Sequence, residues 1–284
     1  MKRSISPLRY PGGKASIFNM ISGVIDNHGY SGGQYIEPYA GGCGLALTLF
    51  FNGIASELYL NDIDRSIWAL WYSILNDTNQ LINRIINIPI NMDEWYAQKL
   101  VQDNKKTADV LDLAVSTLFL NRTNRSGIIK AGVIGGKKQD GNYKMDCRFN
   151  RERLAEQIID ISKHKDKIKF YNLDAVEFIR YIEKLNLDKP VLMVDPPYYN
   201  KGQSLYTNFY KHEDHVDIAN KLKKTTLPWL LTYDNTPEIS SLYETFIQYQ
   251  FDINYSAAKK RVGTELLITS NHFADLNYER LKMT

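Results

Sequence analysis

From Val191 to Tyr198 the chain reads VLMVDPPY. The first four residues form a short apolar run, which is typical of a buried parallel strand. The last four residues then lie at the carboxyl end of that strand, the edge at which open α/β sheets bind their ligands. This stretch predicts a doubly wound sheet with a ligand site beginning at Asp195.

The side chains of this turn suit a flat ring that carries an amino group. The Asp195 carboxylate and the Pro196 carbonyl can accept both hydrogens of such an amine, and the Tyr198 ring offers a face for stacking. Pro197 has a fixed φ and no backbone N–H, which stiffens the turn. The structural alternative is a proline-stopped turn with Asp195 as its cap. We predict that Asp195, Pro196 and Tyr198 act directly on the ligand.

Residues 34–51 are typical of the first half of a nucleotide-binding βαβ unit. A strand at 34–37 is followed by a glycine turn at 41–44 and an apolar helix at 45–51. The turn lacks the third glycine of the dinucleotide fingerprint, so NAD and FAD are not expected. The loop at 8–14 lacks the first glycine and the hydroxyl of a phosphate loop, so an ATPase is not expected either.

Acidic residues end the next two strands. A strand at 57–60 runs into Asp62, whose carboxylate can accept from both hydroxyls of a ribose, whereas Asp64 is expected to cap the following helix. A strand at 168–173 ends at Asp174, for which a helix cap and a cofactor contact are both open. Further strands are expected at 227–233 and 265–269.

Residues 66–165 interrupt the alternation of strands and helices. They include an apolar helix at 109–120 and a glycine-rich basic stretch at 126–138. We therefore predict a Rossmann-like α/β domain formed by residues 1–65 and 166–284, with an inserted helical subdomain at 66–165 that carries a binding loop.

Composition limits the functional classes. With 44% hydrophobic and 24% charged residues, the chain has the make-up of a soluble globular protein. No apolar run approaches the ~20 residues of a membrane span, so we expect an intracellular, cytoplasmic protein without a membrane partner. Cys43, Cys147 and the histidines show no zinc spacing, so no metal site is predicted, and His212 and His215 are expected at the surface.

A net charge of +3 does not by itself identify a nucleic-acid partner. Basic residues gather, however, in segments that are predicted to be loops. These residues are Arg122, Arg125, Lys137, Lys138, Lys259 and Lys260.

Four motifs, in this order, resemble the Dam-like class of S-adenosylmethionine-dependent DNA adenine methyltransferases. They are RYPGGK at 9–14, EPYAGGCG at 37–44, Asn61-Asp62 and DPPY at 195–198. The resemblance spans nearly the whole chain. It implies site-specific methylation of the 6-amino group of adenine in double-stranded DNA, with S-adenosylmethionine as the methyl donor and the target base rotated out of the duplex.

The resemblance also implies which side chains hold the cofactor. These are Tyr10, Lys14, Glu37, Asp62, Asp174 and Asp195. Asp62 would hold the ribose, and Asp195 would lie between the cofactor and the target base. No covalent intermediate is implied, so neither cysteine is expected to act as a nucleophile.

The insert would be the target-recognition domain, because Asn121-Arg122 resembles the pair that opens the DNA-binding loop of this class. The residues expected to contact DNA are Arg9, Asn121, Arg122, Arg125, Lys130, Lys137, Lys138, Lys259 and Lys260. Relatives that modify GATC carry an arginine where this chain has Lys130, and lysine lacks the bidentate fork that reads guanine. A GATC target is therefore not assumed.

Other functions stay open at this point. The same carboxylate would serve methylation of the exocyclic amine of cytosine, or of adenine in RNA. A catalytically silent DNA-binding relative and a small-molecule methyltransferase would share the fold. A cognate restriction endonuclease is an open candidate for a further partner.

Overall fold

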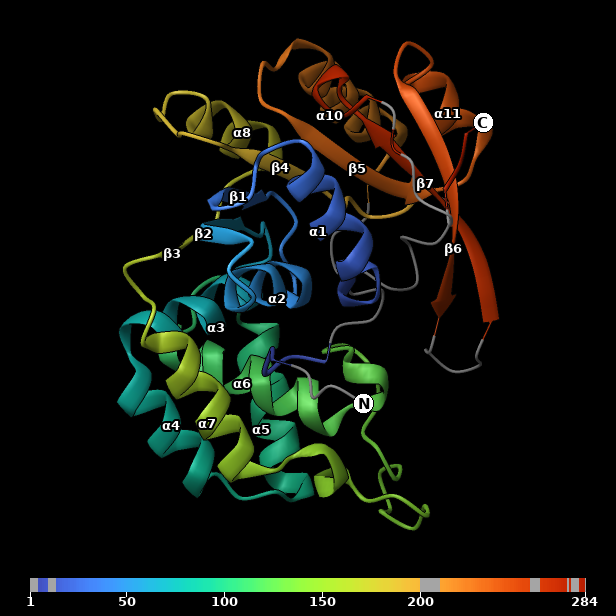
Figure 1. Ribbon diagram of the computed structural model, residues 1–284. Helices are drawn as coiled ribbons and strands as arrows, with labels where there is room; N and C mark the ends of the chain where they lie inside the picture. Colours follow the sequence, from blue (N-terminus) through green and yellow to red (C-terminus); the bar gives the residue numbers. More distant parts are fainter. Residues whose placement is uncertain are drawn as a thin grey trace. The chain divides into compact units, whose positions relative to one another are not determined.

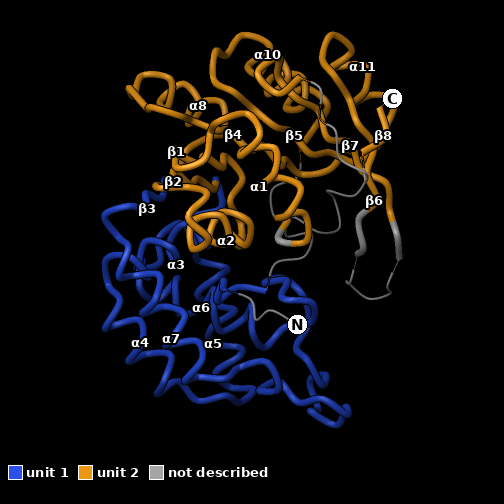
Figure 2. The backbone as a smooth tube through the Cα atoms, viewed as in Figure 1, with its two compact units in different colours: residues 1–11, 63–172 blue, residues 12–62, 173–284 orange. Residues whose placement is uncertain are grey.

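The computed structural model describes residues 5–9, 14–199, 210–255, 261–274, 276 and 281–283. The chain forms two compact units, shown in different colours in Figure 2. Unit 1 contains residues 1–11 and 63–172, and unit 2 contains residues 12–62 and 173–284. The sequence predicts that residues 1–65 and 166–284 belong with the sheet, whereas residues 1–11, 63–65 and 166–172 belong to the same unit as the insert.

Unit 2 contains a mixed sheet. Its strands are β1 (Gly33–Glu37), β2 (Ala55–Asn61), β4 (Val191–Val194), β5 (Trp229–Asp234), β6 (Ile247–Tyr255), β7 (Arg261–Thr269) and β8 (Lys282–Met283). Their order across the sheet is β2-β1-β4-β5-β7-β6-β8. Neighbours from β2 to β5 are parallel, and β7, β6 and β8 continue the sheet with antiparallel pairs.

Helices cover both faces of this sheet, as the parallel strands require. The helices of unit 2 are α1 (Phe18–Asn27), α2 (Gly44–Phe51), α8 (Ala175–Ile182), α10 (His212–Lys224) and α11 (Pro237–Leu242), with the 3-10 turns η1 (Lys14–Ile17) and η4 (Asn271–Phe273). Figure 1 shows α1 and α2 on one side of the sheet and α8 and α10 on the other. Every residue of β4 and β5 is therefore buried, which explains the continuous apolar sequence of β4 and the apolar start of β5.

Unit 1 is mainly helical. Its elements are α3 (Arg65–Asn76), α4 (Thr78–Asn87), α5 (Met92–Asp103), α6 (Val110–Thr123), η2 (Arg125–Gly127), η3 (Met145–Arg148), α7 (Arg151–Ser162) and the strand β3 (Ile168–Tyr171). α6 packs against α3, α4 and α5, and its residues from 113 to 121 are all buried. The apolar helix predicted at 109–120 is thus confirmed as α6, and a helix that is buried on all sides forms the core of its unit.

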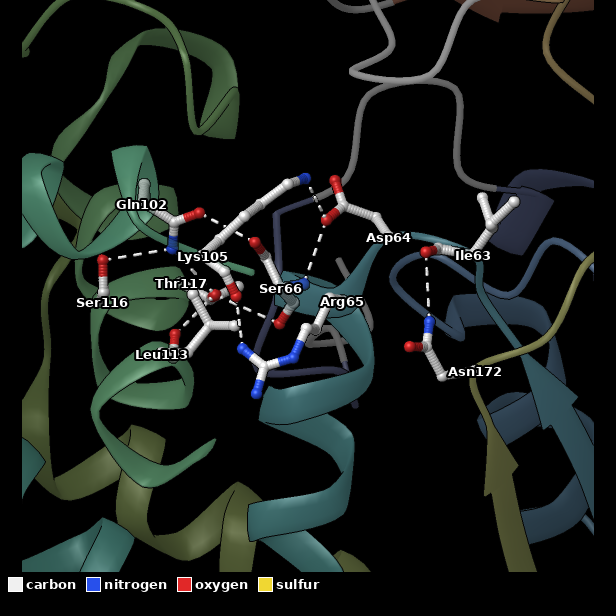
Figure 3. Close-up of polar contacts among 10 residues, drawn as sticks. All are labelled: Ile63, Asp64, Arg65, Ser66, Gln102, Lys105, Leu113, Ser116, Thr117 and Asn172. Carbon is white, nitrogen blue, oxygen red and sulfur yellow. Dashed lines mark hydrogen bonds and ion pairs between the residues drawn. The ribbon is translucent and has the colours of Figure 1, made fainter. Parts of the chain in front are cut away.

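A polar network joins three of these helices (Figure 3). Asp64 caps α3 by accepting from the Ser66 N–H at 3.0 Å, as predicted, and its carboxylate lies 2.8 Å from Lys105 Nζ. Gln102 of α5 accepts from the Ser66 hydroxyl at 2.8 Å and donates to Thr117 Oγ1 of α6 at 3.1 Å. The network pairs polar groups that would be costly to bury alone.

None of the helices within the described ranges combines the length and the apolar character that crossing a membrane requires.

Candidate active site

The carboxyl ends of three parallel strands meet at one edge of the sheet in unit 2. β1 ends at Glu37, β4 is followed directly by Asp195, and β5 ends at Asp234. β1 and β4 are neighbours, with β2 on the far side of β1 and β5 on the far side of β4. The strand order thus reverses between β1 and β4, and such a switch point is where open α/β sheets bind ligands.

Asp195 is held by two donors at the same oxygen. Its Oδ1 accepts from Thr232 Oγ1 and from Lys14 Nζ, each at 2.8 Å. Among the described residues no side chain bonds to Oδ2, and the side chain is 23% exposed. Burial raises the pKa of Asp195, whereas the Lys14 ammonium opposes that rise. The arrangement fixes the carboxylate and leaves one oxygen for a ligand.

Lys14 and Tyr198 join Asp195 to a further carboxylate. The Lys14 ammonium donates to the Tyr198 hydroxyl at 2.7 Å and lies 3.7 Å from Glu265 Oε2. The Tyr198 hydroxyl donates to Glu265 Oε1. Burial alone would lower the pKa of Lys14, but Asp195 and Glu265 raise it above its usual value. The lysine is therefore a buried, charged bridge between two acids.

The Tyr198 ring packs inside this cluster. It is 5% exposed, and the Lys14 ammonium lies 5.0 Å from its centroid. Pro196, in the same turn, is buried as well. Stacking of a planar base on the Tyr198 ring stays a prediction.

Glu37 is a further buried acid at the same edge. The Tyr35 hydroxyl donates to Glu37 Oε1 at 2.8 Å. Burial raises the pKa of Glu37 to about 8, with the nearby Asp195 raising it further and Lys14 and the Tyr35 hydroxyl opposing. Such a carboxyl gains most from a cationic ligand that supplies the missing positive charge.

The glycine turn between β1 and α2 has the backbone of a tight ligand loop. Gly41 and Cys43 adopt positive φ angles of 46° and 50°. The Gly41 N–H donates to Asp62 Oδ2 at 3.0 Å, which ties the end of β2 to this turn. The Asn61 side-chain amide donates to the Pro38 carbonyl at 3.0 Å, which ties β2 to the residue after β1. Asp62 therefore lies beside the turn, where the resemblance had placed a ribose contact.

Asp174 acts as the cap of α8. One carboxylate oxygen accepts from the Val176 N–H at 2.8 Å and from the Glu177 N–H at 3.3 Å. The side chain is exposed. The capping alternative is thus confirmed, and a cofactor contact by the same residue stays a prediction.

Asn121, expected at DNA, is buried within unit 1 at 2% exposure. Its side-chain oxygen accepts from the Arg9 N–H at 2.8 Å, and its amide donates to the Arg9 carbonyl at 2.9 Å and the Gly127 carbonyl at 2.7 Å. These bonds fasten the N-terminal segment to the loop after α6. They explain why residues 1–11 group with the helical unit.

Arginines gather around this same segment of unit 1. Arg122 donates to the Pro7 carbonyl, and burial together with the charges of Arg9, Arg153 and Arg148 lowers its pKa to about 10. Its Nε is buried and has no hydrogen-bond partner among the described residues. Like charges held this close favour a bound anion.

Four further basic residues that were expected to contact DNA follow α6 in the chain, the first of them in η2. Arg125, Lys130, Lys137 and Lys138 are all exposed. Contacts between these side chains and DNA stay predictions. Tyr10, Lys259 and Lys260, which were also expected in the site, lie outside the described residues.

His215 was expected at the surface, and that expectation is wrong, because the residue is 1% exposed. Its Nδ1 lies 2.6 Å from the Tyr233 hydroxyl, and its ring packs against Tyr199 at 5.1 Å between centroids. The signal was the spacing of His215 with the apolar residues 218, 219 and 222 of α10, which marks one buried helix face. His212 is exposed, as predicted.

Several residues of the candidate site escaped the sequence analysis: Tyr35, Thr232, Glu265, Arg148 and Arg153. Glu265 gave the clearest signal, since a lone acid beside the apolar run 266–268 is unusual in a buried strand. Within the described ranges, no group of three or more metal-binding side chains is placed to hold a metal ion.

Comparison with known proteins adds the class of chemistry. The family model "D12 class N6 adenine-specific DNA methyltransferase" matches residues 10–260. A curated relative, "Type II methyltransferase M.CviBI" of Paramecium bursaria Chlorella virus NC1A, is 26% identical over 258 residues, which is 86% of this chain and 89% of that protein. Among solved structures, protein LPL1258 of Legionella pneumophila is matched over 90% of this chain and 85% of its own, with 12% identity and a TM-score of 0.33, a similarity too weak to carry an argument.

Proposed function

The chain belongs to the D12 class N6 adenine-specific DNA methyltransferase family, and from this premise we propose that it transfers a methyl group from S-adenosylmethionine to the 6-amino group of an adenine held at Asp195. The observation that carries the proposal is the arrangement of that carboxylate. Two donors hold Oδ1, while Oδ2 has no partner among the described side chains.

Asp195 has the chemistry that this reaction needs. The adenine amine is a poor nucleophile because its lone pair is delocalised into the ring. Hydrogen bonds from the amine to Asp195 and to the Pro196 carbonyl favour a pyramidal nitrogen, whose lone pair can then attack in line. The carboxylate must be ionised to accept in this way, and the neighbouring Lys14 ammonium favours that form.

The residues at the switch point fit the proposed cofactor. S-adenosylmethionine supplies a methyl group on a positively charged sulfur, together with an ammonium, a carboxylate and a ribose. Glu37 offers a buried carboxyl for the ammonium, the glycine turn offers backbone N–H groups, and Asp62 offers a carboxylate for the ribose. Tyr10, Lys14 and Asp174 are the further contacts that the resemblance implies.

The DNA would bind through unit 1. The arginines around the N-terminal segment provide charge for backbone phosphates, and the exposed basic residues of the loop after α6 provide further contacts. Because a paired adenine hides its amine, the enzyme must rotate the nucleotide out of the duplex before transfer. The Tyr198 ring would then stack on the extruded base.

The test is methylation by the purified protein. Unmethylated double-stranded DNA is incubated with S-adenosylmethionine, and 6-methyladenine is mapped by single-molecule sequencing. We expect methylated adenines in one short sequence context, and an Asp195→Ala variant that binds DNA but methylates at least 10²-fold more slowly, as is typical for a lost transition-state hydrogen bond.

Other results would redirect the proposal. Methylated cytosine, or activity on RNA alone, would move the assignment to another exocyclic amine. Retention of more than about a tenth of the wild-type rate by Asp195→Ala would remove Asp195 from the chemistry. The similarity to a Type II methyltransferase supports a search for a restriction endonuclease with the same recognition sequence.

A further inference from the structure

Glu265 contacts the proposed catalytic turn, residues 195–198, through the Tyr198 hydroxyl. It lies on β7, directly opposite Asp234 of β5 in the antiparallel pair, and it is completely buried. Its Oε1 accepts from the Tyr198 hydroxyl, and its Oε2 lies 3.7 Å from Lys14 Nζ. An acid buried this deeply is costly unless charge and hydrogen bonds compensate it, and both are present here.

The charges around Lys14 explain why a second acid is useful. A buried ammonium with Asp195 alone would form a neutral pair and would draw the charge of Asp195 toward Oδ1. Glu265 shares the ammonium, so the cluster of two acids and one lysine keeps a net negative charge. That charge leaves Asp195 a better acceptor for the hydrogens of a neutral amine.

Geometry adds a second effect. Tyr198 and Lys14 both contact Glu265. Lys14 also pairs with Asp195 and donates to the Tyr198 hydroxyl, so Glu265 is linked to Asp195 through Lys14. Lys14 is one of the two donors that hold Asp195 Oδ1, so a displaced Lys14 would leave only Thr232 to orient the carboxylate. Proper orientation of reacting groups is worth several powers of ten in rate.

We propose that Glu265 is a positioning residue for methyl transfer, which holds Lys14 and Tyr198 so that Asp195 presents Oδ2 to the target amine. The inference rests on the proposed function and deepens it, because it gives Lys14 the role of orienting the Asp195 carboxylate. Glu265 itself touches neither the base nor the methyl donor in this scheme.

The first test is Glu265→Gln, which keeps the shape of the side chain and removes its charge. We expect kcat to fall 10- to 100-fold, the usual effect of losing one charged hydrogen-bond partner, while KM for DNA and the affinity for S-adenosylmethionine stay within about twofold. The matched control is Glu183→Gln, which removes the charge of an acid that directly follows α8 and pairs with Lys221 of α10 at 2.5 Å. The control is expected to keep the wild-type rate.

The pH profile separates positioning from a merely structural role. The charge of Glu265 raises the pKa of Asp195, so Glu265→Gln should move the acid limb of kcat to lower pH. The Lys14 ammonium lowers that pKa, so Lys14→Met should move the limb to higher pH. A general loosening of the fold would move both variants in the same direction or neither.

A double-mutant cycle tests the route of the effect. If Glu265 acts through Lys14, Glu265→Gln should cost less than threefold in rate when Lys14→Met is already present, because coupled sites are not additive. Tyr198→Phe is the second variant if Glu265→Gln fails to fold, as judged by thermal unfolding. It removes only the hydroxyl that is hydrogen-bonded to both Lys14 and Glu265. It should lower kcat about tenfold without changing the affinity for S-adenosylmethionine.

Two results overturn the inference while the wild type remains active. One is a Glu265→Gln enzyme within threefold of the wild-type kcat whose acid limb has not moved. The other is full additivity of Glu265→Gln and Lys14→Met. Failure of the proposed function itself would be seen earlier and separately, as a wild-type protein that methylates no adenine.

Discussion

The Tyr35 hydroxyl donates to Glu37 Oε1 over 2.8 Å, so that two residues of β1 share one hydrogen bond on the same face of the strand. The bond stabilises the ionised carboxyl, yet burial outweighs it and the pKa of Glu37 rises to about 8. Glu37 is therefore mostly protonated at neutral pH, and a cationic ligand must displace that proton.

The raised pKa of Glu37 predicts that binding of the cofactor releases a proton. Between pH 6 and 7.5, binding of S-adenosylmethionine should release close to one proton, and the affinity should fall about tenfold for each pH unit below 8. Calorimetry in buffers of different ionisation enthalpy measures the release. Glu37→Gln should bind more weakly and release none, and an unchanged release in that variant would place the proton elsewhere.

The same residue predicts a change of stability with pH in the protein without ligand. Because the folded-state pKa of Glu37 is raised, its contribution to stability is complete below about pH 4.5 and is lost as the pH rises through about 8. In urea unfolding at pH 5, 7 and 9, the free energy of unfolding of Glu37→Gln should rise relative to that of the wild type as the pH increases. A constant difference between the two proteins would contradict the assignment.

We predict that Asn121 affects DNA binding indirectly, by stabilising the fold of unit 1. Asn121→Ala would leave the Arg9 and Gly127 main-chain groups unpaired, so unfolding in urea should show a loss of about 1–3 kcal/mol. Asn104→Ala, which removes an exposed bond to the Leu100 carbonyl in the same unit, should cost much less. Undiminished stability with strongly weakened DNA binding would instead identify Asn121 as a direct contact.

The arginines of unit 1 are predicted to contribute to the salt dependence of DNA binding. Replacing Arg122, Arg148 and Arg153 by Gln should each flatten the plot of log K against log salt by about 0.9, the value for one neutralised phosphate. Arg84→Gln is the control, since Arg84 already pairs with Asp112 at 2.9 Å in the same unit. Equal slopes for the wild type and the triple variant would rule out phosphate contacts at this cluster.

Local patterns predicted the parts of the fold whose signals lie close together in sequence. The apolar run before Asp195, the glycine turn after β1 and the apolar helix α6 were all identified, because each pattern is set by neighbouring residues. β6 was not predicted, although Ile247–Tyr255 alternates apolar and polar residues, as a half-buried strand does.

Contacts between distant segments could not be predicted in this way. Glu265 reaches Tyr198 only because β7 pairs with β5 in a register that sets Glu265 opposite Asp234. Nothing near position 265 encodes that register. Likewise, Asn121 carries the residue type of a DNA contact, and only the docking of the Arg9 segment shows that its amide is already used inside the protein.

Many of the hydrogen bonds that hold the N-terminal arm, residues 5–9, go to its main chain, while the side chains of Ser6 and Leu8 are buried. Asn121 bonds to backbone groups of Arg9, Arg122 to the Pro7 carbonyl, and Gln157 to the carbonyls of Ile5 and Ser6 at 3.2 and 3.1 Å. Backbone groups are the same in every sequence. Substitutions in the arm therefore leave these bonds in place, whereas the buried side chains of Ser6 and Leu8 must still fit the space that the helical unit provides.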